Sequence, residues 1–434
     1  MEESQKLKAM EDEYNQLVVL YRSKKFNELL VSSKKFVKKY PQNIYGANIL
    51  GLAYKNIGDF EKAIELYELL MKSGVKESSI YTNAGNTYYS IGKISESLLC
   101  HKKALDIDPN AIGSLTGCGL ALYNEGREDE AIEYYKRVTQ IDPSDTSSYY
   151  NIGNILRNQE KYEEAADYYS KHHTKISKAQ ELECIYRLED IEKFDQKLEE
   201  FESDFGSTPL AATISAHASI KYSRVDECQF APNAFELIKK VNLIESQDID
   251  NDFIANFVKD FNSLSINKKT QSLLSNGFQT SGNLFLHEKE SIKILKDIIY
   301  KNIQSYRDQF SHTNFKIFTE WPSQFEIYAW MILIGNQGSL NAHMHKEGWL
   351  SGSLYINIPE KEESSNAGDI RFSLNGGAYK DGGKKFPEKI VDLKTADMVL
   401  FPSSLFHSTI PFNSTKNRIT LAFDVRPPNL DNIL

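Results

Sequence analysis

Four glycines at a constant interval constrain the fold of this chain more than any other feature. They lie 34 residues apart, at Gly51, Gly85, Gly119 and Gly153. The segments around them share an apolar position, a turn and a second apolar stripe, and Pro109 and Pro143 close two of the segments in the same phase. A period of this length indicates stacked structural repeats, because one such segment cannot bury its apolar face alone.

Each repeat is predicted to be a pair of amphipathic helices, because apolar residues recur at three- and four-residue spacing. The two helices are joined by a tight turn at Gly58, Gly92 or Gly126. Small residues allow the paired helices to approach closely, and large ones fill the gap to the next repeat. The small residues are Ala63, Ala131 and Ala165, and the large ones are Tyr67, Tyr135 and Tyr169.

This pattern resembles the tetratricopeptide repeat. A degenerate earlier copy near residue 9 extends the array to about five units over residues 1–178. The resemblance implies an all-α solenoid whose curved surface binds a protein or peptide partner. The alternative is that the array supports the next domain or mediates self-association. Helical patterning continues without the period over residues 179–240, which are predicted to be a helical cap and connector.

Residues 241–434 have a different character. After a helical stretch, short runs rich in β-branched and aromatic residues alternate with turn-forming segments. These runs are QFEIYAWMILI, WLSGSLYINIP, DIRFSL, DMVLFP and RITLAFDV. They predict an antiparallel sandwich or jelly roll with helices along one face, so the whole chain is expected to be multidomain.

Composition excludes several classes of protein. The net charge of −9 argues against nonspecific nucleic-acid binding, which needs a basic surface. The four cysteines form no CxxC pair, which argues against a disulfide framework and a thiolate zinc site. The first residues lack the apolar core of a signal peptide, and no apolar run is long enough to span a bilayer. We therefore expect a soluble, cytoplasmic protein without a membrane partner.

Polar residues alternate along the segment NAHMHKEGW, just before an apolar strand. His343, His345 and Glu347 can share one face of a strand, and burying them without partners would be unfavourable. A divalent cation would satisfy the imidazole nitrogens and the carboxylate together. His407 follows another apolar strand, and two histidines with one carboxylate form the facial triad that leaves positions on iron open.

Arg418 lies eleven residues after His407, at the start of the apolar run ITLAF. A buried cation in a sheet is unfavourable unless it meets an anion. The planar guanidinium group is suited to a bidentate contact with a carboxylate. An anionic ligand beside the metal site is therefore expected.

The segments from GNQGSLNAHMHKEGW to NRITLAFDV resemble the Fe(II)- and 2-oxoglutarate-dependent oxygenases, in particular a prolyl-hydroxylase-like group fused to tetratricopeptide repeats. With the repeats, the resemblance covers most of the chain. It implies a double-stranded β-helix, with iron at the open end and 2-oxoglutarate bound to that iron. It also implies that Arg418 meets the distal carboxylate of 2-oxoglutarate, with Thr420 and Tyr355 as hydroxyl partners.

The chain departs from the family's usual first motif, in which a histidine is followed two residues later by an acidic residue. In one alignment the metal ligands are His343, His345 and His407. In the other, the frame slides by two residues and the ligands are His345, Glu347 and His407. Charge favours the second alignment, because a carboxylate suits a ferrous centre. The position of Glu347 beside Gly348, where the strand turns, favours the first.

The function implied by the resemblance is that of a dioxygenase, which couples oxidative decarboxylation of 2-oxoglutarate by O2 to hydroxylation of a substrate. A protein side chain is a candidate substrate, and the repeats are expected to recruit that substrate or a partner. The alternative is an interaction scaffold whose oxygenase-like domain is catalytically silent. A cupin-type metalloenzyme on a related barrel is less consistent with the sequence, because it leaves Arg418 unexplained.

Overall fold

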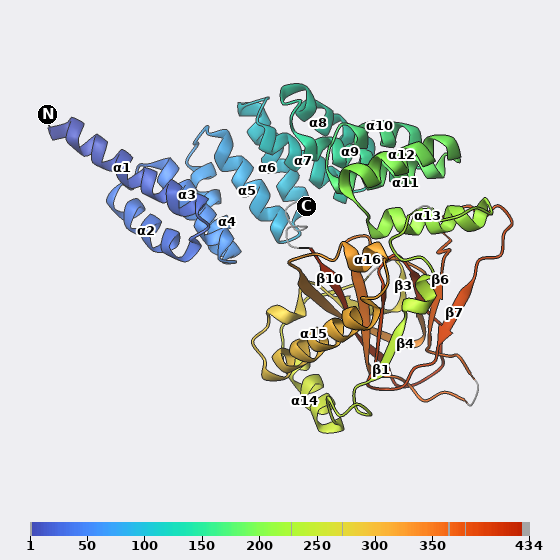
Figure 1. The fold of residues 1–434 in the computed structure, drawn as a ribbon. Helices are drawn as coiled ribbons and strands as arrows, with labels where there is room; N and C mark the ends of the chain where they lie inside the picture. Colours follow the sequence, from blue (N-terminus) through green and yellow to red (C-terminus); the bar gives the residue numbers. More distant parts are fainter. Residues whose placement is uncertain (1, 227, 271, 363–364, 378, 428–434) are drawn as a thin grey trace. The chain divides into compact units, whose positions relative to one another are not determined.

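The computed structural model describes most of the chain, namely residues 2–226, 228–270, 272–362, 365–377 and 379–427. By its internal contacts the chain divides into two compact units, Met1–His173 and Thr174–Leu434. Figure 1 shows the helices and strands of both units. None of the helices in the described residues is both long enough and apolar enough to cross a membrane.

The first unit is a solenoid of consecutive helix pairs (Figure 1). Asn43, Asp59 and Asp145 begin three of the helices by accepting a hydrogen bond from a free backbone N–H group. The helices are α1 (Glu2–Arg22), α2 (Phe26–Lys39), α3 (Ile44–Asn56), α4 (Phe60–Lys72), α5 (Ser78–Ser90), α6 (Ile94–Ile107), α7 (Ile112–Asn124), α8 (Glu128–Ile141), α9 (Thr146–Asn158) and α10 (Tyr162–Ser170).

Glycine and tyrosine pack against each other within the repeats, whereas the sequence placed these tyrosines in the gap to the next repeat. A methyl group placed on Gly119 of α7 would lie 2.7 Å from the ring of Tyr135 on α8. The same close approach joins Gly51 to Tyr67 and Gly153 to Tyr169. These glycines are therefore required by the distance between paired helices.

A histidine replaces the tyrosine in one repeat. His101 on α6 lies 34 residues from both Tyr67 and Tyr135, and its ring packs against Gly85 and Gly117. The side chain is buried, and its Nδ1 has no hydrogen-bond partner among the described residues. An ionisable group thus occupies the core of the solenoid.

The second unit begins with three helices that lie mainly in the segment predicted to be a cap and connector. Further helices and two short 3-10 turns precede or interrupt the sheets. These elements are α11 (Lys175–Arg187), α12 (Ile191–Phe205), α13 (Pro209–Lys221), η1 (Ala234–Leu237), α14 (Asn251–Asn262), η2 (Leu284–Leu286), α15 (Glu290–Phe310) and α16 (Lys316–Thr319).

Two antiparallel sheets form the jelly roll of the second unit. The larger has the strand order β1-β8-β5-β10-β4-β3-β2, and the smaller has the order β7-β6-β9. The strands are β1 (Lys239–Asn242), β2 (Lys268–Lys269), β3 (Leu274–Thr280), β4 (Glu326–Leu340), β5 (Leu350–Asn357), β6 (Ile370–Ser373), β7 (Glu388–Val391), β8 (Asp397–Pro402), β9 (Phe406–Thr409) and β10 (Arg418–Arg426).

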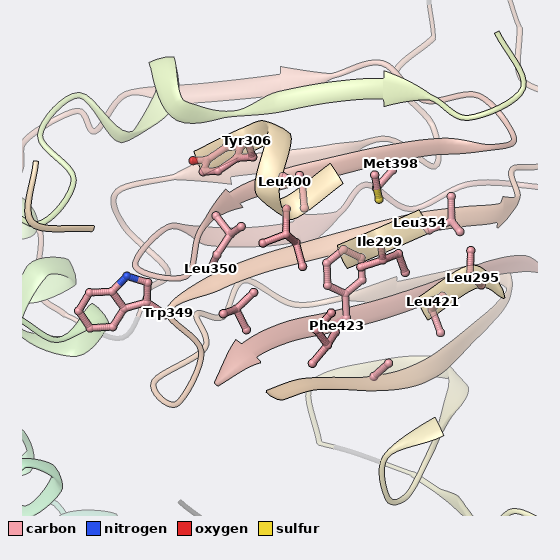
Figure 2. Close-up of a cluster of buried hydrophobic side chains, with 14 of the residues drawn as sticks. Leu295, Ile299, Tyr306, Trp349, Leu350, Leu354, Met398, Leu400, Leu421 and Phe423 are labelled. Atoms are coloured by element: carbon pink, nitrogen blue, oxygen red, sulfur yellow. The ribbon is translucent and has the colours of Figure 1, made fainter. Parts of the chain in front are cut away.

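The two faces of the larger sheet have different roles. Side chains on one face, including Leu421 and Phe423 of β10, pack against Leu295 and Ile299 of α15 in the main apolar core (Figure 2). The opposite face meets the smaller sheet, where Tyr355 and Val399 pack with Phe372. Because strand side chains alternate, the polar residues of β10 lie together on this second face. They are Arg418, Thr420, Asp424 and Arg426.

Candidate metal centre

The backbone holds His343 opposite His407. The N–H group of His343 donates to the carbonyl oxygen of His407 at 3.1 Å, and the N–H group of His407 donates to that of His343 at 2.9 Å. This isolated antiparallel bridge extends the smaller sheet beyond β9. Directly opposite residues project to the same face, so the two imidazole rings lie with centroids 4.3 Å apart.

His345 reaches the same point two residues along the chain. Its backbone N–H donates to the carbonyl oxygen of Ser403 at 3.2 Å, and its Nε2 lies 3.3 Å from Nε2 of His343. One ligand atom from each of His343, His345 and His407 can be chosen so that all three lie within 4.8 Å of one another. The structure therefore brings together the three histidines of the first alignment.

The opposite nitrogen of each ring faces a hydrogen-bond acceptor. Nδ1 of His343 lies 2.8 Å from the carbonyl oxygen of Asn341, and Nδ1 of His407 lies 3.3 Å from that of Leu405. Nδ1 of His345 lies 2.6 Å from Oδ1 of Asp424. Carbonyl and carboxylate oxygens only accept, so each Nδ1 carries the hydrogen. The Nε2 lone pairs are then left free for a shared ligand.

The protonation states of the histidines favour binding of a cation. Burial and the neighbouring His345 lower the pKa of His343 to about 4. Burial, with the other two histidines nearby, holds the pKa of His407 well below its ordinary value. These two rings are therefore neutral at neutral pH. Converging nitrogen lone pairs repel one another unless a metal ion lies between them, and imidazole is a suitable ligand for divalent iron.

Glu347 is not part of this cluster. Its side chain is 55% exposed, and Oε2 lies 3.3 Å from Nη1 of Arg426. Glu347 also precedes β5, which begins at Leu350. The residue proposed as the alternative ligand is thus placed in a partly solvated ion pair.

A buried cation lies deeper on the same face. Arg418 is 3% exposed, and it donates from Nε to the carbonyl oxygen of Gly368 at 3.0 Å and from Nη1 to Oγ1 of Thr420 at 2.9 Å. Among the described residues no carboxylate forms an ion pair with it; burial lowers its pKa, and Tyr355 and the more distant Asp369, which is paired with Lys361, oppose that effect. Tyr355 lies opposite Thr420 in the pairing of β5 with β10, and its ring centroid is 4.8 Å from Cζ of Arg418.

The hydroxyl of Tyr355 is an orphaned polar group. It is fully buried and forms no hydrogen bond of good geometry within the described ranges, and the burial that raises its pKa is partly opposed by the neighbouring Arg418 and Ser353. One cavity is lined by the three histidines together with Tyr355, Arg418 and Thr420. A buried guanidinium that lacks a carboxylate ion-pair partner, together with this hydroxyl beside a histidine cluster, favours a small anionic group at Arg418.

Two polar residues of the centre were not singled out from the sequence. Asp424 is 1% exposed and accepts from both His345 and Ser351, whose Oγ lies 2.8 Å from Oδ1 of Asp424. Burial opposes ionisation, yet His345 and Arg426 hold the pKa of the Asp424 carboxyl below its ordinary value. A signal was present, since Asp424 is an acidic residue in phase with Arg418 and Thr420 along an apolar strand.

The helical segment of the second unit also contacts the histidine-bearing segment. Glu183 of α11 is 3% exposed, and its carboxylate accepts from Nζ of Lys346 at 2.7 Å. The same carboxylate accepts from the hydroxyl of Tyr379 at 3.2 Å. Lys346 lies directly after His345, so one buried carboxylate links α11, the segment with two of the histidines, and the long loop that contains Tyr379.

Comparisons with known proteins agree with this architecture. Fold and site define a tetratricopeptide-repeat protein that carries a jelly-roll domain with a histidine centre. Residues 328–424 match the family described as "Putative 2OG-Fe(II) oxygenase", and they contain all of the site residues named above except Glu183 and Arg426. Matches to tetratricopeptide-repeat families cover residues 47–73, 85–126, 119–159 and 148–177. The predicted fusion of repeats to an oxygenase domain of this family is confirmed.

Three solved structures are distantly similar to this chain. Pseudomonas aeruginosa PilF is 14% identical, with 47% of this chain and 95% of that chain covered and a TM-score of 0.41. MamA is 22% identical, with 41% and 95% covered and a TM-score of 0.33. The repeat protein TTC0263 of Thermus thermophilus is 16% identical, with 44% and 99% covered and a TM-score of 0.34. No curated protein matches the chain.

Proposed function

We propose that the second unit is an Fe(II)- and 2-oxoglutarate-dependent dioxygenase, with iron held by His343, His345 and His407. The observation that carries this proposal is the convergence of the three rings, whose outer nitrogens are each fixed by an acceptor. Three imidazole ligands on one side of a metal leave the other side for substrate and oxygen. Glu347 is engaged with Arg426 and is not assigned as a ligand.

Arg418 is the proposed anchor for 2-oxoglutarate. It is a buried guanidinium without a carboxylate partner in the described chain, and it shares a cavity with the three histidines. The distal carboxylate of 2-oxoglutarate would neutralise it and accept from the hydroxyls of Thr420 and Tyr355. The unused Tyr355 hydroxyl is then satisfied by the ligand.

With the iron and 2-oxoglutarate bound, O2 is consumed as one oxygen atom enters succinate, with loss of CO2, and the other is inserted into a C–H bond of the substrate. The chain itself orients these reactants and excludes water. Arg418 would hold one end of 2-oxoglutarate, and the histidines would hold the iron that binds the other end. Apolar side chains also line this cavity, namely Trp330, Ile332, Leu340, Ile370 and Ala422.

The repeats supply the proposed recruiting surface. A solenoid of stacked helix pairs presents an extended curved face that suits a peptide or a folded protein. A protein side chain is accordingly the proposed substrate. This part of the proposal is supported by the joint presence of repeats and an oxygenase domain in one chain.

Anaerobic titration of the full chain with Fe(II) and then 2-oxoglutarate tests the activity. We expect a visible charge-transfer band that requires both additions, and succinate formation when oxygen is admitted. The His407→Ala variant should show neither, whereas His312→Ala, which alters an exposed histidine, should behave as wild type. Folded wild-type protein that gives neither band nor succinate would establish the catalytically silent scaffold instead.

A further inference from the structure

The three proposed ligands differ in what holds their outer nitrogen. His343 and His407 donate to neutral backbone carbonyls, whereas His345 donates to the carboxylate of Asp424 at 2.6 Å. Of the three rings, His345 alone is thus joined to a buried negative charge. Its position is also where the common facial triad would place its own carboxylate.

We propose that Asp424 is a positioning residue that gives the metal centre, through His345, the negative charge that an acidic ligand would otherwise supply. This inference rests on the proposed function, since it assumes that the three histidines bind iron. A carboxylate on the outer N–H fixes the tautomer and ring orientation and makes the inner nitrogen a stronger donor. The centre then has the net charge of a site with two histidines and one carboxylate, although all three ligands are imidazoles.

The surroundings of Asp424 are built around this carboxylate. Ser351 is its direct neighbour in the pairing of β5 with β10, and the serine hydroxyl donates to the Oδ1 that accepts from His345. The side chain of Ser403 in turn contacts that of Ser351 at 2.7 Å. Two strands and the turn after β8 therefore hold the oxygen that faces the imidazole.

A glycine makes room for the same oxygen. A methyl group on Gly348 would lie 2.9 Å from Oδ1 of Asp424, closer than carbon and oxygen approach without strain. The segment that carries His345 therefore passes over Asp424 only because residue 348 has no side chain. The contact between His345 and Asp424 therefore depends on the glycine at position 348.

The charge of Asp424 is not cancelled by its other partner. Nη2 of Arg426 lies 3.3 Å from Oδ2 of Asp424, and Nη1 of Arg426 lies 3.3 Å from Glu347. One cation is thus shared between two carboxylates, which leaves the group with one net negative charge. Glu347 contributes to the electrostatics of the centre in this way without binding the metal.

Isothermal titration calorimetry of the full chain with Co(II), as a redox-stable substitute for Fe(II), tests the inference without any turnover. Asp424→Asn keeps the size of the side chain and removes the charge, and Asp424→Ser serves as a second neutral variant if the first does not fold. We expect a roughly 10- to 100-fold loss of Co(II) affinity, the range found when carboxylate partners of ligating histidines are removed. Thermal unfolding of the metal-free proteins checks that each variant is folded.

Repeating the Asp424→Asn substitution in a second variant, His345→Glu, distinguishes an electrostatic role of Asp424 from a structural one. In His345→Glu the ligand itself carries the negative charge, and it would face Asp424 with like charge. Here Asp424→Asn should raise Co(II) affinity or leave it unchanged, whereas a merely structural role of Asp424 predicts the same loss in both backgrounds. Equal losses in both, or no loss in the wild-type background, would overturn the inference. Wild-type protein that binds no Co(II) would contradict the proposed function itself.

Discussion

His343 and His407 are opposite members of a single antiparallel bridge, with both backbone hydrogen bonds formed at 3.1 and 2.9 Å. The separation of their rings is therefore set by the pairing of two chain segments that are 64 residues apart in sequence. The backbone therefore holds the two imidazole rings in place before a metal ion binds them.

Removal of either bridging ring should abolish tight metal binding. His407→Ala leaves only two imidazole ligands. Loss of a residue that merely hydrogen-bonds a metal ligand lowers metal affinity by about 10- to 100-fold, so loss of a ligand itself should lower Co(II) affinity by at least about 100-fold. Calorimetry with Co(II) measures the change. His312→Ala is the matched control, because His312 is exposed and its Nδ1 contacts only the carbonyl oxygen of Gln309 in the described structure.

The two alignments of the metal motif make opposite predictions for two conservative changes. Glu347→Gln should change Co(II) affinity by no more than about fivefold, because an exposed ion pair is worth less than about 1 kcal/mol. His343→Gln should instead reduce affinity to the level of His407→Ala. If Glu347→Gln abolished binding while His343→Gln retained it, the ligand set would be His345, Glu347 and His407.

Binding of 2-oxoglutarate should depend on Arg418 independently of the metal. Arg418→Met removes the guanidinium and keeps an apolar stem, so calorimetry with 2-oxoglutarate on Co(II)-loaded protein should show at least about a 30-fold loss. Tyr355→Phe removes one hydroxyl and should cost about 1 kcal/mol of binding free energy, or about fivefold in affinity. Loss of Co(II) binding in Arg418→Met would point to a collapsed site rather than to a missing carboxylate partner.

The buried histidine of the solenoid should make its stability depend on pH. Burial lowers the pKa of His101 to about 4, compared with 6.5 for a solvated histidine. The unfolded chain therefore takes up a proton first, so stability is complete above about pH 6.5 and is lost as the pH falls toward 4. At pH 5 the loss amounts to about 2 kcal/mol.

The test of this pH dependence is chemical unfolding of wild type and His101→Gln, followed through the helical signal, at pH 7.5 and pH 5. The destabilisation on acidification should be smaller by about 2 kcal/mol in the variant, because glutamine does not titrate. An identical pH dependence in the two proteins would show that the pKa of His101 is the same in the folded and unfolded states. Other histidines are common to the two proteins and cancel in the comparison.

Two glycines of one helix should respond in opposite ways to alanine. Gly119→Ala places a methyl group 2.7 Å from the Tyr135 ring, so overpacking should destabilise the solenoid by about 1–3 kcal/mol. Gly113→Ala, also on α7, meets only a side-chain methyl of Thr82 at 3.3 Å, which must yield by a few tenths of an ångström. Its gain in helix propensity, up to about 1 kcal/mol, should leave stability unchanged or raised. Thermal unfolding compares the pair.

The repeats and the jelly roll were predictable because each leaves a regular periodicity in the sequence. A 34-residue spacing specifies stacked helix pairs, and the alternation along RITLAFDV specifies which residues of β10 share a face. The ligand frame was not predictable in the same way. His343 is placed by hydrogen bonds to His407, and Glu347 is drawn to Arg426, and neither contact follows from local spacing. Asp424 lay in phase with Arg418, but the sequence alone does not distinguish a buried aspartate from a solvent-exposed one near the end of a strand.

The carboxylate of Glu183 sets a limit on where the second unit can be cut. A fragment that started at β1, or at residue 328 where the family match begins, would lack α11 and leave Lys346 and Tyr379 without the group that accepts from both. Lys346 adjoins His345, so the segment with the first two histidines would lose an anchor. Expression of the second unit alone should therefore begin no later than Thr174, with all three connecting helices retained.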